Sequence, residues 1–109
     1  TKIILYKTAF YSFYLPIASG MIITGETGEA DLAAARKISM ELGHKFQIQD
    51  DYLDCYGDPE AIGKVGTDIM DHKCTWLVMK ALQKVTKEQR QILENHYGKE
   101  EEEHQSKIK

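Results

Sequence analysis

The feature that most constrains the fold is residues 29–56, a long stretch whose apolar side chains recur at helical intervals. Alanines near its start also favour a helix. Its apolar stripe is formed by Leu32, Ala35, Ile38, Leu42, Phe46 and Leu53. No part of the sequence alternates cleanly between apolar and polar residues for the length of a strand, and no internal repeat is present. The pattern therefore predicts an all-α protein.

A second helix is predicted for residues 2–23. Residues 9–24 carry no charge, but this run is shorter than the roughly 20 apolar residues that a membrane-spanning helix needs. We expect a buried core helix instead, apolar on nearly every side. Because Pro16 lacks an N–H group, it should remove the hydrogen bond to the Ser12 carbonyl and kink the helix. Neither a membrane span nor a secretory signal is predicted.

An ordered loop is predicted for residues 57–71, which include three glycines and one proline. Loops of this length in compact domains are usually functional or disordered. The next helix, residues 72–85, would use Asp71 as its N-cap. Its apolar stripe, which we expect to join the core, consists of Trp76, Met79, Leu82 and Val85.

The last predicted helix begins at a capping-box pattern formed by Thr86 and Gln89. It should end near Tyr97, because glycine, here Gly98, is a common C-terminal stop signal. The acidic run 100–103 then begins another, solvated segment. Both ends of the chain fall inside apparent helices, so we expect residues 1–109 to be part of one larger domain.

Three aspartates, called here the aspartate cluster, crowd the C-terminal end of the helix predicted for residues 29–56: Asp50, Asp51 and Asp54. Residues three and four apart share a helix face, so these side chains should form one polar patch with Gln47. Like charges at the negative end of a helix dipole destabilise the helix unless they are neutralised. Oxygen ligands favour a hard cation, and magnesium is commonly held by one or two carboxylates and substrate phosphates. The spacing alone also permits a solvated acidic face.

Other functions are excluded by motif and composition. An EF-hand is excluded by Tyr52 and Cys55, which stand where its loop requires an oxygen ligand and a glycine. A P-loop is excluded because five residues separate Gly57 from Gly63 and because Val65 replaces the Ser or Thr. A net charge of -3 with scattered basic residues does not indicate a nucleic-acid partner. The two cysteines form no CxxC motif, so neither a zinc site nor a disulfide is indicated, and a cytoplasmic setting is expected.

Three isolated lysines lie in segments that could face the aspartate cluster. Lys7, next to Thr8, lies in the middle of the first predicted helix, Lys64 lies in the glycine-rich loop, and Lys73 lies at the start of the following helix. Taken singly, each is more often a solvated surface residue. Together they supply the positive charges that a diphosphate bridged to magnesium would need.

Four segments in order, YKTAFYSFYLPIA, FQIQDDYLD, GKVGTDI and DHKCTW, resemble the farnesyl diphosphate synthases of the short-chain trans-prenyl transferase family. The likeness covers almost the whole chain, and DDxxD in this context is a specific signal. It implies the isoprenoid synthase fold, an all-α helical bundle around a central cavity. Residues 1–109 would be a fragment of that single domain and would carry its second aspartate-rich motif. The resemblance also implies a cytoplasmic homodimer, any N-terminal leader lying outside this chain.

The implied reaction condenses an allylic diphosphate, dimethylallyl or geranyl diphosphate, with isopentenyl diphosphate to make farnesyl diphosphate. Ionisation of the allylic diphosphate would be followed by attack of the isopentenyl double bond and loss of a proton. The implied magnesium ligands are Asp50, Asp51 and Asp54. The implied substrate-binding residues are Lys7, Thr8, Tyr11, Phe46, Gln47, Lys64 and Lys73, of which Tyr11 and Phe46 would form part of the homoallylic pocket. The implied catalytic residues are Lys7, Thr8 and Lys64, and Asp68 would support the lysines.

The sequence departs from this family pattern at two positions, where Lys45 replaces an aromatic residue and His72 replaces an asparagine. The first aspartate-rich motif is not in this chain, so the chain alone should be inactive, and product chain length cannot be assigned from it. Two alternatives stay open. A terpene cyclase would ionise a prenyl diphosphate without isopentenyl diphosphate, and a non-catalytic helical interaction module would have no need of these aspartates and lysines.

Overall fold

The computed structural model describes residues 2–109, which form helices and connecting segments without any strand. The all-α prediction is confirmed. The chain divides into two compact units, one ending at Gln47 and the other spanning Ile48–Lys109. Helix α2 (Glu29–Tyr56) has the predicted bounds and contributes residues to both. Among the residues described, no helix is sufficiently long and apolar to cross a bilayer.

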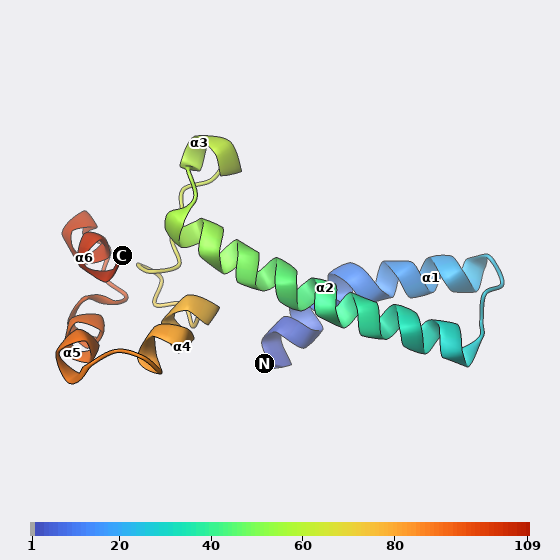
Figure 1. Ribbon diagram of the computed structural model, residues 1–109. Helices are drawn as coiled ribbons and strands as arrows, with labels where there is room; N and C mark the ends of the chain where they lie inside the picture. Colours follow the sequence, from blue (N-terminus) through green and yellow to red (C-terminus); the bar gives the residue numbers. More distant parts are fainter. Residues whose placement is uncertain (1) are drawn as a thin grey trace. The chain divides into compact units, whose positions relative to one another are not determined.

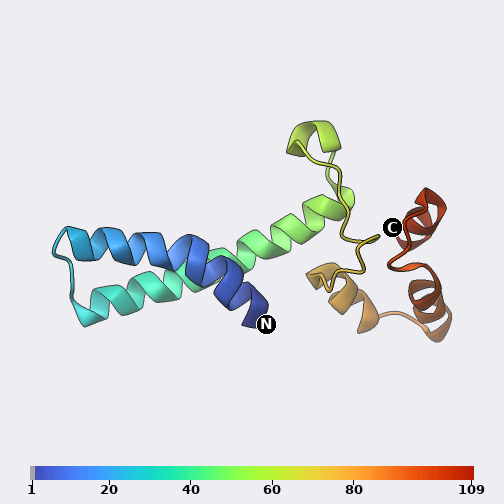
Figure 2. The same ribbon diagram turned by 180° about the vertical axis from the view of Figure 1, so that it is seen from behind.

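The first unit is a helical hairpin. A π-helix, η1 (Ile4–Tyr14), continues directly into α1 (Leu15–Ile23), and α1 lies antiparallel to the first part of α2 in both views (Figures 1 and 2). Pro16 lies in the first turn of α1, where its missing N–H costs least. The chain reverses at residues 24–28, and Gly25 supplies a φ of 86° there.

The two helices of this unit approach at their backbones. Ala9 of η1 is fully buried, and a Cβ atom built on Gly43 of α2 would lie 2.4 Å from the Cα atom of Ala9. Only glycine allows that approach. Near it, the rings of Phe13 and Phe46 pack edge to face with their centroids 5.7 Å apart. These contacts fix how η1 lies against α2.

The prediction of a buried core helix at residues 2–23 is wrong for this unit. Among η1 and α1, only Thr8, Ala9 and Ala18 are buried, and Ile23 is 84% exposed. The physical reason is that an apolar helix needs neighbours on every side to be buried, whereas this hairpin supplies α2 on one side.

The second unit begins with the end of α2 and contains a short helix inside the predicted loop. This helix, α3 (Pro59–Ile62), begins after Asp58, whose side chain accepts a hydrogen bond from the Glu60 amide at 3.0 Å. It ends at Gly63, whose φ of 73° is left-handed. The prediction of a continuous loop over residues 57–71 is therefore wrong. A capping aspartate followed by proline is a helix-start signal, and it operates here.

The next helix, α4 (Trp76–Leu82), begins later than predicted. Its N-cap is Thr75, whose hydroxyl accepts from the Val78 amide at 3.2 Å, so the assignment of Asp71 as N-cap is wrong. A helix cannot pass through His72, because its φ of 52° is left-handed. The apolar stripe is not the core that was predicted, since Trp76 and Met79 are 38% and 44% exposed.

Helix α5 (Lys87–His96) confirms the predicted capping box, since Thr86 and Gln89 each accept a hydrogen bond from the backbone amide of the other. It ends at Tyr97 and Gly98 as expected. Those two residues also anchor the loop before α4. The Gly98 amide donates to the Ile69 carbonyl at 2.9 Å, and the Tyr97 hydroxyl donates to the Lys73 carbonyl at 2.5 Å. Helix α6 (Glu102–Ile108) follows.

Candidate functional site

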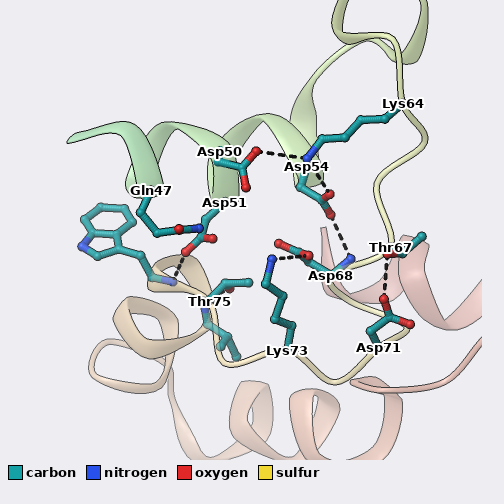
Figure 3. A network of polar contacts seen from close by, with 12 residues as sticks. Gln47, Asp50, Asp51, Asp54, Lys64, Thr67, Asp68, Asp71, Lys73 and Thr75 are labelled. Carbon is teal, nitrogen blue, oxygen red and sulfur yellow. Dashed lines mark hydrogen bonds and ion pairs between the residues drawn. The ribbon is translucent and has the colours of Figure 1, made fainter. Parts of the chain in front are cut away.

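The aspartate cluster lies where the last turns of α2 meet the loop of residues 63–75 (Figure 3). The Asp68 amide donates a hydrogen bond to Asp54 Oδ2 at 2.8 Å. A Cβ atom at Gly66 would lie 1.7 Å from the Asp54 carbonyl oxygen, so this approach requires glycine at position 66. The loop backbone is thereby held directly against the carboxylates.

Lys64 bridges two members of the cluster. Its Nζ atom lies 3.0 Å from Asp50 Oδ1 and 3.5 Å from Asp54 Oδ1. The hydrogen bond to Asp50 raises the pKa of Lys64, with a further contribution from Asp54, so the ammonium group stays charged. Its side chain is 47% exposed, whereas that of Asp54 is only 7% exposed. An accessible ammonium group therefore contacts two carboxylates, of which Asp54 is nearly buried and also accepts from the Asp68 amide.

Asp51 has a different environment from its neighbour Asp50. It is only 3% exposed, and its Oδ2 atom accepts a hydrogen bond from the Trp76 amide at 2.6 Å. That amide belongs to the first residue of α4, where a carboxylate is favoured by the helix dipole. The carboxylate of Asp51 thus holds the start of α4 against α2.

Lys73 is held by Asp68, with Nζ and Oδ1 separated by 2.8 Å. Desolvation raises the pKa of the Asp68 carboxyl, although the hydrogen bond from Lys73 opposes this. Partial burial tends to lower the pKa of Lys73, but Asp68 and the other carboxylates outweigh it, so the pKa is raised overall. The lysine carries its charge at neutral pH, and 45% of its side chain is exposed.

An apolar cavity of about 210 Å³ adjoins this polar network within the second unit. Its lining includes Asp51 and Asp68 together with Ile69, Val78, Leu93 and Tyr97. This lining contributes to the burial of Asp51 and Asp68, which are 3% and 6% exposed, whereas the side chains of Lys64 and Lys73 are about half exposed. The carboxylates are held in place by amide and ammonium donors.

The remaining predicted site residues lie in the first unit. The Thr8 hydroxyl is buried and donates to Gln47 Oε1 at 3.0 Å, so these two are brought together. Lys7, Tyr11 and Phe46 are exposed. Their predicted roles in substrate binding and catalysis stay predictions.

The donor set of the cluster fits a hard cation. Among residues 2–109, no group of three or more His, Cys, Asp or Glu side chains is arranged to hold a metal ion. Two carboxylates, Asp50 and Asp54, do converge on one positive group, the Lys64 ammonium. Magnesium is commonly held by one or two carboxylates with phosphate oxygens and waters completing its shell. These two oxygen donors therefore suit magnesium in the presence of a phosphorylated ligand.

Two functional features of the site were not found from the sequence. The Trp76 amide that binds Asp51 carries no sequence signal, because every residue except proline has such a group. As one of three glycines between residues 57 and 71, Gly66 carries no local signal of its role. The signal that could have identified it is its place between Lys64 and Asp68, both of which must reach the same end of α2.

Comparison with known proteins relates this arrangement to one family. The family model described as polyprenyl synthetase matches residues 1–109. Farnesyl pyrophosphate synthase of Gallus gallus is 57% identical over 107 residues, covering 98% of this chain and 29% of that protein. The Homo sapiens enzyme of that name is 57% identical over 108 residues, covering 99% of this chain and 26% of that protein. The chain thus spans under a third of these relatives' length.

A solved structure of T. brucei farnesyl diphosphate synthase, complexed with a bisphosphonate, is also similar. Its TM-score is 0.92 at 38% sequence identity, and the match covers 97% of this chain and 36% of that one. The likeness therefore extends to the helices and to the loop that carry the site.

Proposed function

Because this chain belongs to the polyprenyl synthetase family, we propose that its protein condenses an allylic diphosphate with isopentenyl diphosphate to make farnesyl diphosphate. The observation that carries the proposal is the charge arrangement at the end of α2. Carboxylates of Asp50 and Asp54 and the accessible ammonium groups of Lys64 and Lys73 form one patch. Such a patch can bind a cation and a polyanion together. A cytoplasmic homodimer is part of the same proposal.

Magnesium would be held by Asp50 and Asp54, whose oxygens already face one positive group. When bound there, the metal would stabilise the negative charge that develops on the departing diphosphate. For Asp51, its hydrogen bond to the Trp76 amide indicates a supporting position behind these ligands. The family resemblance implies Asp51 as a third metal ligand, and magnesium titration of Asp51→Asn tests that role.

The lysines would bind the diphosphate oxygens of the allylic substrate. Charge-assisted hydrogen bonds from Lys64 and Lys73 would be shorter and stronger than neutral ones, and they would strengthen as the leaving group gains charge. The family resemblance also implies that Lys7, Thr8 and Gln47 bind this substrate, and within the first unit the Thr8 hydroxyl donates to Gln47 Oε1 at 3.0 Å. Tyr11 and Phe46 would contact isopentenyl diphosphate.

The test uses the full-length protein with geranyl diphosphate, magnesium and labelled isopentenyl diphosphate. Label in a longer prenyl diphosphate is the expected product. Asp50→Asn should reduce product formation by at least about 100-fold, since a metal ligand is lost, whereas Asp71→Asn should not change it. Asp71 is a matched control because it is an exposed carboxylate bound only by the Thr67 hydroxyl among the described side chains.

Two results would overturn the proposal. Volatile hydrocarbons or alcohols formed equally well without isopentenyl diphosphate would identify a terpene cyclase. No turnover of any prenyl diphosphate by a folded full-length protein would instead support a non-catalytic helical module.

A further inference from the structure

Two histidines outside the aspartate cluster face each other across neighbouring helices. Helices α5 and α6 lie next to each other in both views (Figures 1 and 2). His96 is the last residue of α5, and His104 lies in the first turn of α6. Their Nδ1 atoms are 2.5 Å apart, and their ring centroids are 4.8 Å apart with the planes tilted by 36°. The two imidazoles therefore bring two ring nitrogens to one point.

At least one of these nitrogens presents a free lone pair to the other. Only one of two Nδ1 atoms this close can carry a hydrogen. The Glu101 carboxylate lies 3.7 Å from Nε2 of His104 and favours a hydrogen on that atom. Nδ1 of His104 is then the lone-pair atom, and Nδ1–H of His96 donates to it. A carboxylate beside the far ring nitrogen is also the usual partner of a metal-binding imidazole.

The surroundings of the pair favour the neutral imidazole, which is the form that binds a metal ion. Desolvation lowers the pKa of His96, and nearby positive charges lower it further, whereas Glu103 opposes them. One of those charges, Lys107, would repel a cation, but its Nζ atom lies 2.6 Å from Glu103, which offsets it. The His104 side chain is 24% exposed, so an ion can reach the pair from solvent.

We propose that His96 and His104 form a binding site for a divalent transition-metal ion. Imidazole nitrogens suit zinc, copper and nickel, whereas magnesium prefers oxygen ligands, so the ion differs from the one that suits the aspartate cluster. Two imidazoles leave the remaining coordination positions to water. The bound ion would link α5 to α6. This inference does not rest on the proposed function, because neither histidine belongs to the proposed diphosphate site.

Binding requires only a small adjustment of the two rings. Zinc bonds to imidazole nitrogen at about 2.1 Å, so tetrahedral geometry holds two such nitrogens about 3.3 Å apart. Rings whose nitrogens are 2.5 Å apart would separate by less than about 1 Å. The hydrogen on Nδ1 of His96 would move to Nε2 of the same ring through solvent, and Nδ1 would then bind the ion. No net proton is released when both rings are neutral.

The experiment titrates zinc into the full-length protein by calorimetry at about pH 8, where both imidazoles are neutral. Saturating magnesium is present, so that the aspartate cluster does not take up zinc. We expect His96→Asn and His104→Asn each to weaken zinc binding at least about 100-fold, since even the outer partners of metal-binding histidines contribute about 10–100-fold. The double variant should bind no more weakly than either single variant, because one site has been lost.

A matched control is His44→Asn, which should leave zinc affinity unchanged. His44 is a half-buried histidine of α2 whose Nδ1 atom lies 2.9 Å from the Met40 carbonyl in its own helix. A second readout is hydrogen exchange of the α6 amides. Zinc binds the folded pair and should therefore increase their protection in the parent but not in either histidine variant.

Four results would overturn the inference. They are no zinc binding by the parent, zinc binding that survives both substitutions, a loss caused by one of them alone, and zinc that leaves α6 protection unchanged. Melting temperatures show whether each variant is folded. If His96→Asn or His104→Asn fails to fold, the corresponding glutamine variant replaces it and has the same expected outcome.

Discussion

Removing the Lys64 side chain should change magnesium binding and diphosphate binding in opposite directions. In the structure the Lys64 ammonium lies 3.0 Å from Asp50 and 3.5 Å from Asp54, where it neutralises the two carboxylates proposed to hold the metal. Lys64→Ala removes that competing positive charge, so magnesium alone should bind more tightly. The same substitution removes a donor to the substrate, so the allylic diphosphate should bind more weakly.

The size of each effect follows from the exposure of the groups. Ion pairs made by partly exposed groups contribute about 0–1 kcal/mol each, so releasing two of them should strengthen magnesium binding by up to roughly 30-fold. A charge-assisted hydrogen bond contributes about 1.5–3 kcal/mol, so its loss should weaken substrate binding by roughly 10–150-fold. The free energy of unfolding should fall by no more than about 1 kcal/mol, because the Lys64 side chain is half exposed.

The assay is calorimetry on the full-length protein. Magnesium is titrated into the parent and into Lys64→Ala without ligand, and a non-reactive allylic diphosphate analogue is then titrated in the presence of saturating magnesium. Lys84→Ala is the matched control, since Lys84 is an exposed lysine of the same unit without an ion pair to any described residue. The same titrations on Asp50→Asn and Asp51→Asn separate the two neighbouring carboxylates, and only the first should abolish magnesium binding.

The reasoning would be refuted if Lys64→Ala weakened magnesium binding, or if it left the affinity for the diphosphate analogue unchanged. The first result would mean that Lys64 does not compete with the metal. The second would mean that Lys64 is an ordinary surface lysine that does not bind the diphosphate. Equal magnesium affinity with and without the analogue would also contradict the proposed site, in which phosphate oxygens complete the metal shell.

Two further predictions concern the scaffold around the site. Gly66→Ala would place a Cβ atom 1.7 Å from the Asp54 carbonyl oxygen, so the loop must move. We expect the free energy of unfolding, measured with denaturant, to fall by about 2 kcal/mol and product formation to fall as well, and unchanged stability would contradict this. Desolvation and the charges of Lys107 and His104 lower the pKa of His96, so below about pH 6.5 the unfolded state binds more protons than the folded state. Protection of the α6 amides from hydrogen exchange should therefore fall as the pH drops through that range. His96→Asn should remove this dependence, and protection that is independent of pH in the parent would refute it.

The sequence by itself determined the helices whose signals are local. The stripe from Leu32 to Leu53 predicted α2 with its observed bounds, and the pair Thr86 and Gln89 predicted the start of α5. Periodicity and capping act within a few residues along the chain, so they can be recognised without knowing the neighbours. For the same reason the sequence located the aspartate cluster on one helix.

Tertiary structure decided what surrounds each element. The burial of residues 2–23 was overestimated because burial depends on how many neighbours pack against a helix, which its own composition does not specify. The start of α4 moved from residue 72 to Trp76, because His72 adopts a left-handed conformation and Thr75 supplies the cap. Those choices depend on how the loop is anchored by residues distant in sequence.

Tertiary structure also gave equivalent aspartates different partners. Spacing places the three aspartates at one end of a helix, but only the fold determines which donor each of them binds. Asp50 accepts from Lys64, Asp51 from the Trp76 amide and Asp54 from the Asp68 amide. Two of these donors are backbone N–H groups, which carry no sequence signal. The pairing of Asp68 with Lys73 likewise depends on the turn between them, since a carboxylate and an ammonium meet only where the backbone brings them together.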